Sequence, residues 1–190
     1  MTTETTRTQI IQHAERLVQE RGCNGFSYRD LAALIGIKTS SIHYHFPQKE
    51  DLLLAVAQQY HTRWQTAMQT IDVGLSADAK LRAYIDAHQR AFCDTERICL
   101  ATALAADVAS LPAGVRQSVQ DFYRANEDWL ARVLEQGIRE GSLRVPGDLR
   151  TAARSMFAAL QGSLVSARLF KNSDRVEDLL SAALGLREMT

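Results

Sequence analysis

The chain has 190 residues, and its 22 basic and 22 acidic side chains give a formal net charge of zero. This length suits one compact domain, or a small domain joined to a medium one, and a hydrophobic content of 46% is enough for a real core. A balanced charge excludes a general electrostatic attraction to nucleic acid or to an anionic membrane. No apolar run approaches the roughly 18 residues of a membrane span, and the first residues lack the apolar segment of a signal peptide. We therefore expect a cytoplasmic protein without a membrane partner.

Apolar residues recur at helical spacing almost throughout the chain, which predicts an all-α fold of about nine helices and no strand. The first stripe covers residues 10–18. Thr6 and Gln9 have the spacing of a capping box before it, and Gly22 follows as a stop signal. We therefore expect a first helix that begins near Thr6 and ends at Gly22.

A helix hairpin follows the first helix. Ser27 and Asp30 are spaced to open one short helix that ends at Gly36, and a second short helix is expected from Thr39 to His45. Pro47 ends the hairpin. The apolar side chains that the first of these helices should bury are Leu31, Leu34 and Ile35.

The rest of the chain continues the helical pattern. A helix with Glu50 and Asp51 in its first turn is expected to run to residues 72–78, which we expect to be the joint between two modules. Asp148 is placed to cap a later helix. Further helices are expected to include residues 81–92, 98–108, 115–141, 152–165 and 176–184.

The hairpin has the form of a helix-turn-helix, in which the second helix enters the major groove of DNA. Ile37, Ile42 and Phe46 would hold one side of that helix in the core. Ser27, Tyr28 and Arg29 lie at the first turn of the preceding helix, where Arg29 could reach guanine or phosphate and Tyr28 a phosphate. Hydrogen-bonding groups on the other side come from Lys38, Thr39, Ser40, Ser41, His43, Tyr44 and His45.

Periodicity alone does not establish DNA binding, because helix hairpins with solvated polar faces are common. The order of residues is more specific. It runs Gly-x-x-x-Phe-Ser-Tyr-Arg-Asp-Leu-Ala, then Gly-Ile, then Ser-Ser-Ile-His-Tyr-His-Phe-Pro-Gln-Lys-Glu-Asp-Leu. This order resembles the N-terminal domain of TetR/AcrR-type transcriptional regulators, densely over residues 7–56 and beyond that only in length and helix pattern.

The resemblance implies a three-helix DNA-binding domain, here residues 1–50, joined to a helical effector-binding and dimerisation domain, residues 51–190. It also implies a homodimer that binds a palindromic operator on double-stranded DNA, usually as a repressor, and leaves it when a small-molecule effector binds. By position, Tyr28 and Arg29 match contacts of the second helix, and Lys38 to Ser41 with His43, Tyr44 and His45 match the recognition helix. Lys49 matches a lysine that contacts phosphate.

Two residues depart from the family pattern. Lys38 stands where a Ser-like cap is common, and a lysine cannot cap a helix, so we expect the cap at Thr39. His43 stands where a Tyr is common. Because an ordinary histidine takes up a proton near pH 6.5, operator affinity is expected to rise below about that pH.

Aromatic and polar residues beyond the hairpin are candidates for the effector pocket. For each of them the alternative is an ordinary core position, and His88 on an apolar stripe is more often a satisfied core histidine than a ligand contact. Such residues would line an apolar pocket with a few hydrogen-bonding groups. The candidates are Tyr60, Trp64, Tyr84, His88, Phe92, Cys99, Phe122, Tyr123 and Trp129.

The three cysteines, Cys23, Cys93 and Cys99, are expected to be free thiols, because their number is odd and no C-x-x-C spacing occurs. Residues 99–108 resemble the start of a helix in a NemR-like branch of the family, where a cysteine can react with electrophiles or oxidants. A helix N-terminus and the nearby Arg97 favour such a thiolate. A thiol sensor built on Cys99, with Cys93 as resolving partner, is therefore an alternative function.

Other classes find less support. His43 and His45 are two apart, so they point to nearly opposite faces of a helix and cannot chelate together. We expect no metal site, no cofactor and no enzyme, because phosphate-loop, catalytic-triad and metalloprotease motifs are missing. A helical interaction module without DNA binding stays open. Small residues that should allow close packing of the last two helices in a dimer are Ala153, Ala159, Gly162, Ala167, Ala182 and Ala183.

Overall fold

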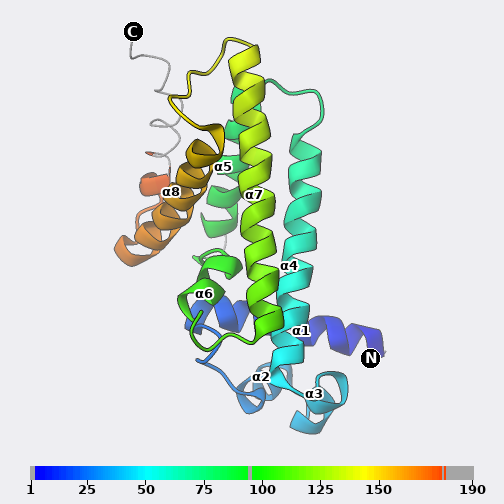
Figure 1. The fold of residues 1–190 in the computed structure, drawn as a ribbon. Helices are drawn as coiled ribbons and strands as arrows, with labels where there is room; N and C mark the ends of the chain where they lie inside the picture. Colours follow the sequence, from blue (N-terminus) through cyan, green and yellow to red (C-terminus); the bar gives the residue numbers. More distant parts are fainter. Residues whose placement is uncertain (1–2, 94–95, 177, 179–190) are drawn as a thin grey trace. The chain divides into compact units, whose positions relative to one another are not determined.

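The computed structural model describes residues 3–93, 96–176 and 178, and every regular element within them is a helix (Figure 1). Residues 174–176 and 178 are also helical, so the all-α class and the expected number of about nine helices are confirmed. Most of the expected last helix, 176–184, lies outside the described residues. The other helices are α1 (Thr3–Arg21), α2 (Tyr28–Ile35), α3 (Thr39–His45), α4 (Lys49–Ile71), α5 (Ala77–Cys93), α6 (Leu100–Ala106), α7 (Ala113–Arg139) and α8 (Leu149–Phe170).

The chain forms two compact units. The first unit comprises the described parts of Met1–Arg63 and Leu100–Phe122, and the second comprises those of Trp64–Cys99 and Tyr123–Thr190. Helices α4 and α7 therefore contribute residues to both units. The domain boundary that we expect after residue 50 stays a prediction. None of the described helices has the length and apolar character that crossing a bilayer would require.

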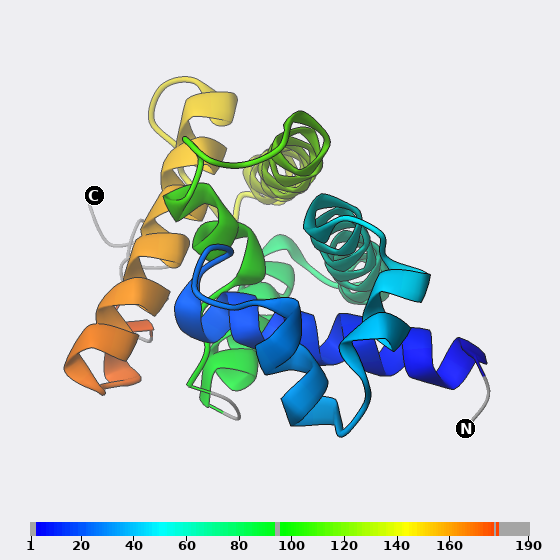
Figure 2. The same ribbon diagram turned by 90° about the horizontal axis from the view of Figure 1, so that it is seen from below.

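In the first unit, α1 packs against α2 and α6, and α2 packs against α3, as the view from below shows (Figure 2). Helix α1 begins at Thr3, so the expected start near Thr6 is wrong, while its expected end at Gly22 is confirmed. Gly22 has a φ of +77° and donates its N–H to Val18 O. Fully buried residues of this core include Ile10, Ala14, Leu31, Ile42, Leu52 and Val56.

The turn between α1 and α2 is tied to the end of α6. The Cys23 N–H donates to Asp107 Oδ2 at 2.8 Å, and Asn24 Nδ2 donates to Ser110 Oγ at 2.8 Å. A Cβ at Gly22 would lie 2.8 Å from Asp107 Oδ2, so a glycine is needed here for space as well as for its positive φ. These contacts hold the turn between α1 and α2 against the residues that follow α6.

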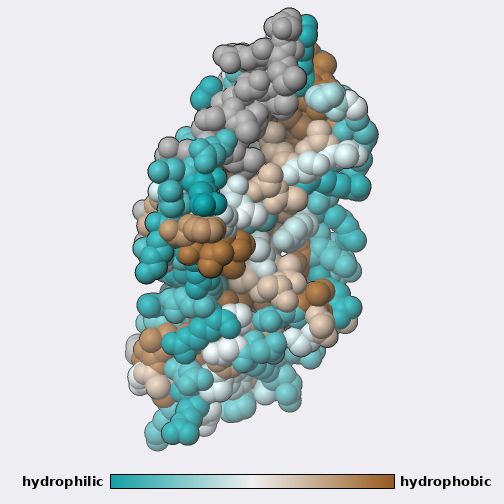
Figure 3. All heavy atoms as spheres, turned by 90° about the vertical axis from the view of Figure 1, so that its left-hand side faces the viewer, coloured by the Kyte–Doolittle hydropathy of each residue, from teal (hydrophilic) through white to brown (hydrophobic). Residues whose placement is uncertain are grey.

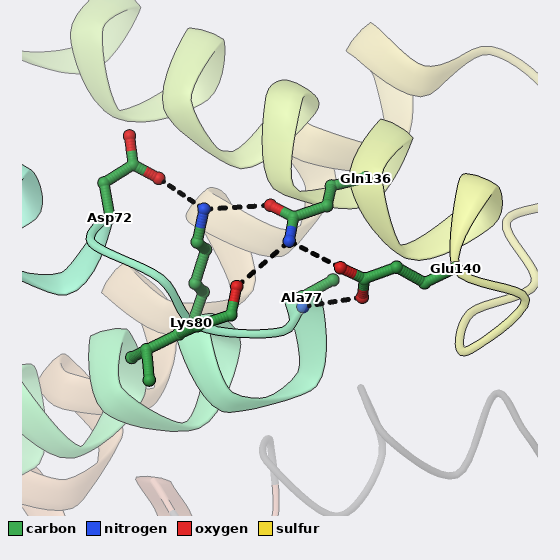
Figure 4. A network of polar contacts seen from close by, with 6 residues as sticks. Asp72, Ala77, Lys80, Gln136 and Glu140 are labelled. Atoms are coloured by element: carbon green, nitrogen blue, oxygen red, sulfur yellow. Dashed lines mark hydrogen bonds and ion pairs between the residues drawn. The ribbon is translucent and has the colours of Figure 1, made fainter.

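In the second unit, a polar network joins the end of α4 to α5 and α7 (Figure 4). The buried Lys80 donates to Asp72 Oδ1 at 2.7 Å and to Gln136 Oε1 at 2.9 Å. Glu140 accepts the Ala77 N–H at 2.9 Å and caps α5. A loop separates Ile71 from Ala77, so the expected break in the helical pattern is confirmed. This loop does not separate the two compact units, which divide between Arg63 and Trp64 inside α4.

Helix α8 begins as expected, because the Asp148 carboxylate accepts the Thr151 N–H at 2.8 Å. Its small residues are placed differently from the expectation. Ala153 and Ala167 are both 0% exposed inside their own chain, so they are not available to a partner. Ala159 and Gly162 are exposed, and the remaining expected interface residues, Ala182 and Ala183, lie outside the described residues.

Candidate nucleic-acid interface

Residues at each end of helix α2 determine where it begins and where it ends. The Ser27 side chain accepts the Asp30 N–H, and Asp30 Oδ2 accepts the Ser27 N–H at 2.8 Å, so the expected capping box is confirmed. Hydrogen bonds from Ser27 hold the pKa of Asp30 below its ordinary value. Gly36, with a φ of +78°, ends the helix. Leu34 was expected to be buried but is 45% exposed, because α2 turns Leu31 toward the core instead.

Helix α3 covers Thr39–His45, as expected. Lys38 is its N-cap and makes no side-chain cap bond, while Thr39 is already inside the helix. The expected cap at Thr39 is therefore wrong, and the first turn lacks a side-chain acceptor. Ile42 and Phe46, at 0% and 3% exposure, anchor the other side of the helix in the core.

The outer face of this hairpin carries most of the residues expected to contact DNA. Tyr44 is 77% exposed. His43 is exposed too, with its Nδ1 3.4 Å from Pro47 O and its ring 4.8 Å from the Tyr28 ring. The other exposed members of the expected set are Ser27, Arg29, Lys38 and Ser40, and the half-buried ones are Thr39, Ser41, His45 and Lys49.

Tyr28 has a different environment. It is 9% exposed, and its hydroxyl lies 2.9 Å from Phe46 O and 2.8 Å from Gln48 O. Burial raises the pKa of this hydroxyl to about 12, with the Asp51 charge as a second cause, so it stays a donor. The hydroxyl thus faces the chain's own carbonyls, where the sequence led us to expect a phosphate contact. Tyr28 fixes the end of α3 to α2 and to the start of α4.

Lys49 also makes an internal contact. Its Nζ donates to Phe26 O and lies 4.2 Å from the centroid of the Phe26 ring. Burial lowers the pKa of Lys49. An ammonium has three donors, so this single bond does not exhaust the side chain.

Sequence reasoning missed two contacts that position the hairpin. The first is the bond from Cys23 to Asp107, which spans 84 residues. The second is Arg7, whose guanidinium carbon lies 5.1 Å from the centroid of the Phe46 ring. No local pattern marks either contact, because each depends on helices that pack together from distant parts of the chain.

The residues expected in the effector pocket fall into separate groups. In the first unit, the rings of Tyr60 and Phe122 are 5.4 Å apart. In the second unit, we define the aromatic cluster as Trp64, Tyr84, His88 and Trp129. Its ring-centroid distances are 4.1 Å between Trp64 and His88, 4.6 Å between Tyr84 and His88, and 5.0 Å between Tyr84 and Trp129. The remaining candidates, also in the second unit, are the buried Phe92 and Cys99 and the half-buried Tyr123.

His88 is a buried core histidine with only one nitrogen satisfied. It is 2% exposed, and its Nδ1–H donates to Tyr84 O at 3.0 Å. Its Nε2 has no hydrogen-bond partner, so the expectation of a satisfied histidine is wrong for this atom. Burial lowers the pKa of His88 to about 4 and keeps the ring neutral.

All three cysteines are free, as expected. Cys99 directly precedes α6 but is 5% exposed, whereas Cys93 is exposed. Burial, together with a hydrogen bond to Asp107, raises the pKa of Cys23 to about 11. Within the described residues, no three His, Cys, Asp or Glu side chains gather as metal ligands.

Two family models match the chain. Residues 10–56 match the model for "Bacterial regulatory proteins, tetR family", and residues 77–183 match "Tetracyclin repressor-like, C-terminal domain". The chain belongs to the TetR family. The first of these matches covers the hairpin with its exposed α3, and the second covers most of the second unit.

Relatives of this TetR-family chain agree with the assignment. The crystal structure of a TetR-family transcriptional regulator from Agrobacterium tumefaciens superposes with a TM-score of 0.93 and 31% identity, covering 96% of this chain and 97% of that one. The transcriptional repressor NemR of Escherichia coli K12 is 24% identical over 182 residues, 93% of this chain and 90% of NemR. The repressor KstR2 of Rhodococcus jostii is 28% identical over 151 residues, 78% of this chain and 72% of KstR2. The protein is therefore a ligand-responsive, DNA-binding transcriptional regulator.

Proposed function

We propose that this regulator is a homodimeric repressor, that its α3 helices read the two halves of a palindromic operator, and that a small effector in the second unit releases it. The supporting observation is the hairpin itself. Ile42 and Phe46 pack one side of α3 into the core, and the Tyr28 hydroxyl donates to Phe46 O at the end of the helix. The opposite side of α3 exposes hydrogen-bonding side chains. A short helix held from behind in this way is suited to the major groove.

Specific side chains follow from this geometry. Arg29 and Lys38 are exposed cations at the starts of α2 and α3, where each could bind phosphate or guanine. Ser40, His43 and Tyr44 offer donors and acceptors along α3. Since the chain has no net charge, affinity has to come from a few such placed contacts.

A homodimer is supported by the outer face of α8. Ala158, Gly162, Val165 and Leu169 are exposed and follow one another at steps of four, three and four residues, which places them in one stripe. Figure 3 views the molecule from the side where α8 lies in Figure 1, and hydrophobic residues gather there among hydrophilic ones. Val165 and Leu169 are 43% and 75% exposed, so the stripe presents large apolar side chains together, as a surface that packs against a partner would. Two-fold symmetry would also match two recognition helices to a palindrome.

This function needs no catalytic step, and we expect no enzymatic activity. Because operators lie on the chromosome, we also expect the protein to be found in the cytoplasm. Sedimentation velocity provides the check on assembly. A dimer at micromolar concentration that becomes a monomer in Leu169→Lys would fit the α8 interface, and a wild-type monomer would contradict it.

The DNA function is tested by fluorescence anisotropy with DNA from upstream of the protein's own coding sequence. Arg29→Ala and Lys38→Ala should each weaken binding. Each should also reduce the magnitude of the negative slope of log affinity against log salt concentration by about one. Arg16→Ala is a matched control, because this exposed arginine on α1 only pairs with Glu20. If no upstream fragment binds, or if the three variants behave alike, the proposal fails.

A further inference from the structure

Two polar atoms in the aromatic cluster have no hydrogen-bond partner. His88 Nε2 and Trp129 Nε1 are both buried, in side chains that are 2% and 3% exposed. The Tyr84 ring contacts the rings of both His88 and Trp129. Its hydroxyl does have a partner, because it donates to Asn126 Oδ1 at 2.6 Å. The cluster therefore satisfies its central polar group and leaves the two flanking ones unsatisfied.

The two unsatisfied atoms have opposite roles. His88 Nδ1 faces a carbonyl oxygen, which can only accept, so Nδ1 carries the proton and Nε2 presents a lone pair. Trp129 Nε1 carries a hydrogen and can only donate. Buried polar groups are nearly always paired, and an unpaired one opposes folding. A phenylalanine at either position would avoid this cost, so the two polar atoms call for an explanation outside packing.

We infer that the aromatic cluster is the effector site, and that its ligand is a small, neutral, flat molecule that donates a hydrogen bond to His88 Nε2 and accepts one from Trp129 Nε1. This inference rests on the proposed function, for which it supplies the ligand class. Trp64 from α4, His88 from α5 and Trp129 from α7 then change their environment together when the ligand binds.

The chemistry of the cluster selects the class. Its side chains are aromatic rings, which favour flat apolar ligands through stacking. No charged side chain belongs to the cluster. Lys80, the buried cation among the described residues of this unit, is already bonded to Asp72 and Gln136. An ionised carboxylate or an ammonium would therefore lose its hydration without gaining a counter-charge. A neutral ligand with one donor and one acceptor is the complement of what the protein offers.

The two tryptophans of the chain, Trp64 and Trp129, both belong to the cluster, so intrinsic fluorescence reports on this site. Two probe pairs of equal size separate the hydrogen bonds. Phenol and toluene differ in a donor, and acetophenone and isopropylbenzene differ in an acceptor. In the wild-type protein, each polar probe should give a saturable change in the millimolar range and bind about tenfold more tightly than its apolar twin.

Variants assign each preference to one atom. His88→Phe keeps a stacked ring and should remove the preference for phenol over toluene. Trp129→Phe should remove the preference for acetophenone while Trp64 still reports binding. His13→Phe, at a half-buried histidine of α1 in the first unit, is the control and should change neither preference.

Several outcomes would overturn the inference. They are the absence of saturable binding by any probe, equal binding within each pair, or preferences that survive in His88→Phe and Trp129→Phe. Benzoate binding more tightly than phenol would also overturn it. Because the wild-type comparison needs no variant, a variant that fails to fold leaves the test intact.

Operator binding, measured on the same preparations without probe, separates this inference from the proposed function. If the wild type binds DNA but shows no preference between probes, the ligand class is wrong and the DNA function stands. If the probes bind as expected but no DNA fragment does, the ligand site stands and the proposed function fails.

Discussion

Replacing Tyr28 by Phe removes one oxygen from the hinge of the hairpin and leaves the ring in place. In the wild type that hydroxyl has one hydrogen for two carbonyls, Phe46 O at 2.9 Å and Gln48 O at 2.8 Å. The bond to Phe46 O is buried. The substitution therefore loses a hydrogen bond and also leaves carbonyl oxygens that are shielded from water.

The expected cost follows from these two losses. A hydrogen bond contributes about 1 kcal/mol, and stranding a partly buried acceptor adds a comparable amount, so Tyr28→Phe should lower the free energy of unfolding by about 1–2 kcal/mol. For a chain of this size, the melting temperature should fall by roughly 4 °C. DNA binding by the folded variant should weaken only modestly, because the hydroxyl bonds to the chain's own carbonyls and not to DNA. The salt slope should not change, because the substitution removes no charge.

The pH dependence of stability gives a second readout. The pKa of Tyr28 is about 12 in the folded protein against an ordinary 10, so the folded state holds this proton more tightly than the unfolded state does. The stabilisation is complete below pH 10 and is lost as the pH rises toward 12. The stability difference between wild type and Tyr28→Phe should therefore shrink over this interval.

Urea denaturation from pH 7 upward and anisotropy titrations at several salt concentrations measure both quantities. Tyr44→Phe is the matched control, because that tyrosine is on the same hairpin but 77% exposed, and its stability should stay within about 0.5 kcal/mol of wild type. If Tyr28→Phe kept wild-type stability but weakened operator binding about tenfold or more, the Tyr28 hydroxyl would be a DNA contact and not an internal hydrogen bond.

Three further predictions concern the rest of the chain. Lys80→Met should lower the free energy of unfolding by about 1–2 kcal/mol in urea, because it removes a buried ammonium that bonds to both Asp72 and Gln136. Unchanged stability would mean that the network is incidental. Iodoacetamide at neutral pH should label the exposed Cys93 first and Cys23, with its pKa near 11, last, as peptide mass spectrometry can show; rapid labelling of Cys99 would instead revive the thiol-sensor alternative. Acid should destabilise the protein partly through Asp148, whose pKa is lowered by hydrogen bonds at the α8 N-terminus. The stabilisation from this carboxylate is present above the ordinary pKa of an aspartate and is lost as the pH falls through the lowered pKa. Asp148→Asn should therefore lose less of its stability than the wild type between pH 5 and about 3.

Local signals were sufficient to predict most helix boundaries. Ser27 with Asp30, Gly36, Gly22 and Asp148 all act at the ends of helices where the sequence indicated, because caps depend on residues within one turn. The prediction at Thr6 was wrong for the opposite reason. The same spacing occurs inside a helix that already continues toward the N-terminus, and spacing alone does not distinguish the two cases.

Contacts between distant residues could not be predicted. The burial of Tyr28 depends on the chain returning at Phe46 and Gln48, and the Cys23 bond depends on α6. Helical periodicity placed His88 in the core correctly, but the state of each nitrogen depends on neighbours from α4 and α5. Residue type and spacing predict which face is buried, and they do not predict which polar atoms within it remain unpaired.

Lys38 is a proposed DNA contact at a position where another residue would stabilise α3 better. It occupies the N-cap of α3 with the extended backbone of a cap, φ −76° and ψ 145°, yet makes no cap bond. Lys38→Ser should supply the missing acceptor and raise the free energy of unfolding by about 1 kcal/mol, measured in urea. The same change removes an exposed cation, so operator affinity and its salt slope should fall. Stability and affinity would then move in opposite directions, as expected where a sequence gives up a local interaction for function. If affinity rose together with stability, the order of the α3 first turn, and not the Lys38 charge, would limit DNA binding.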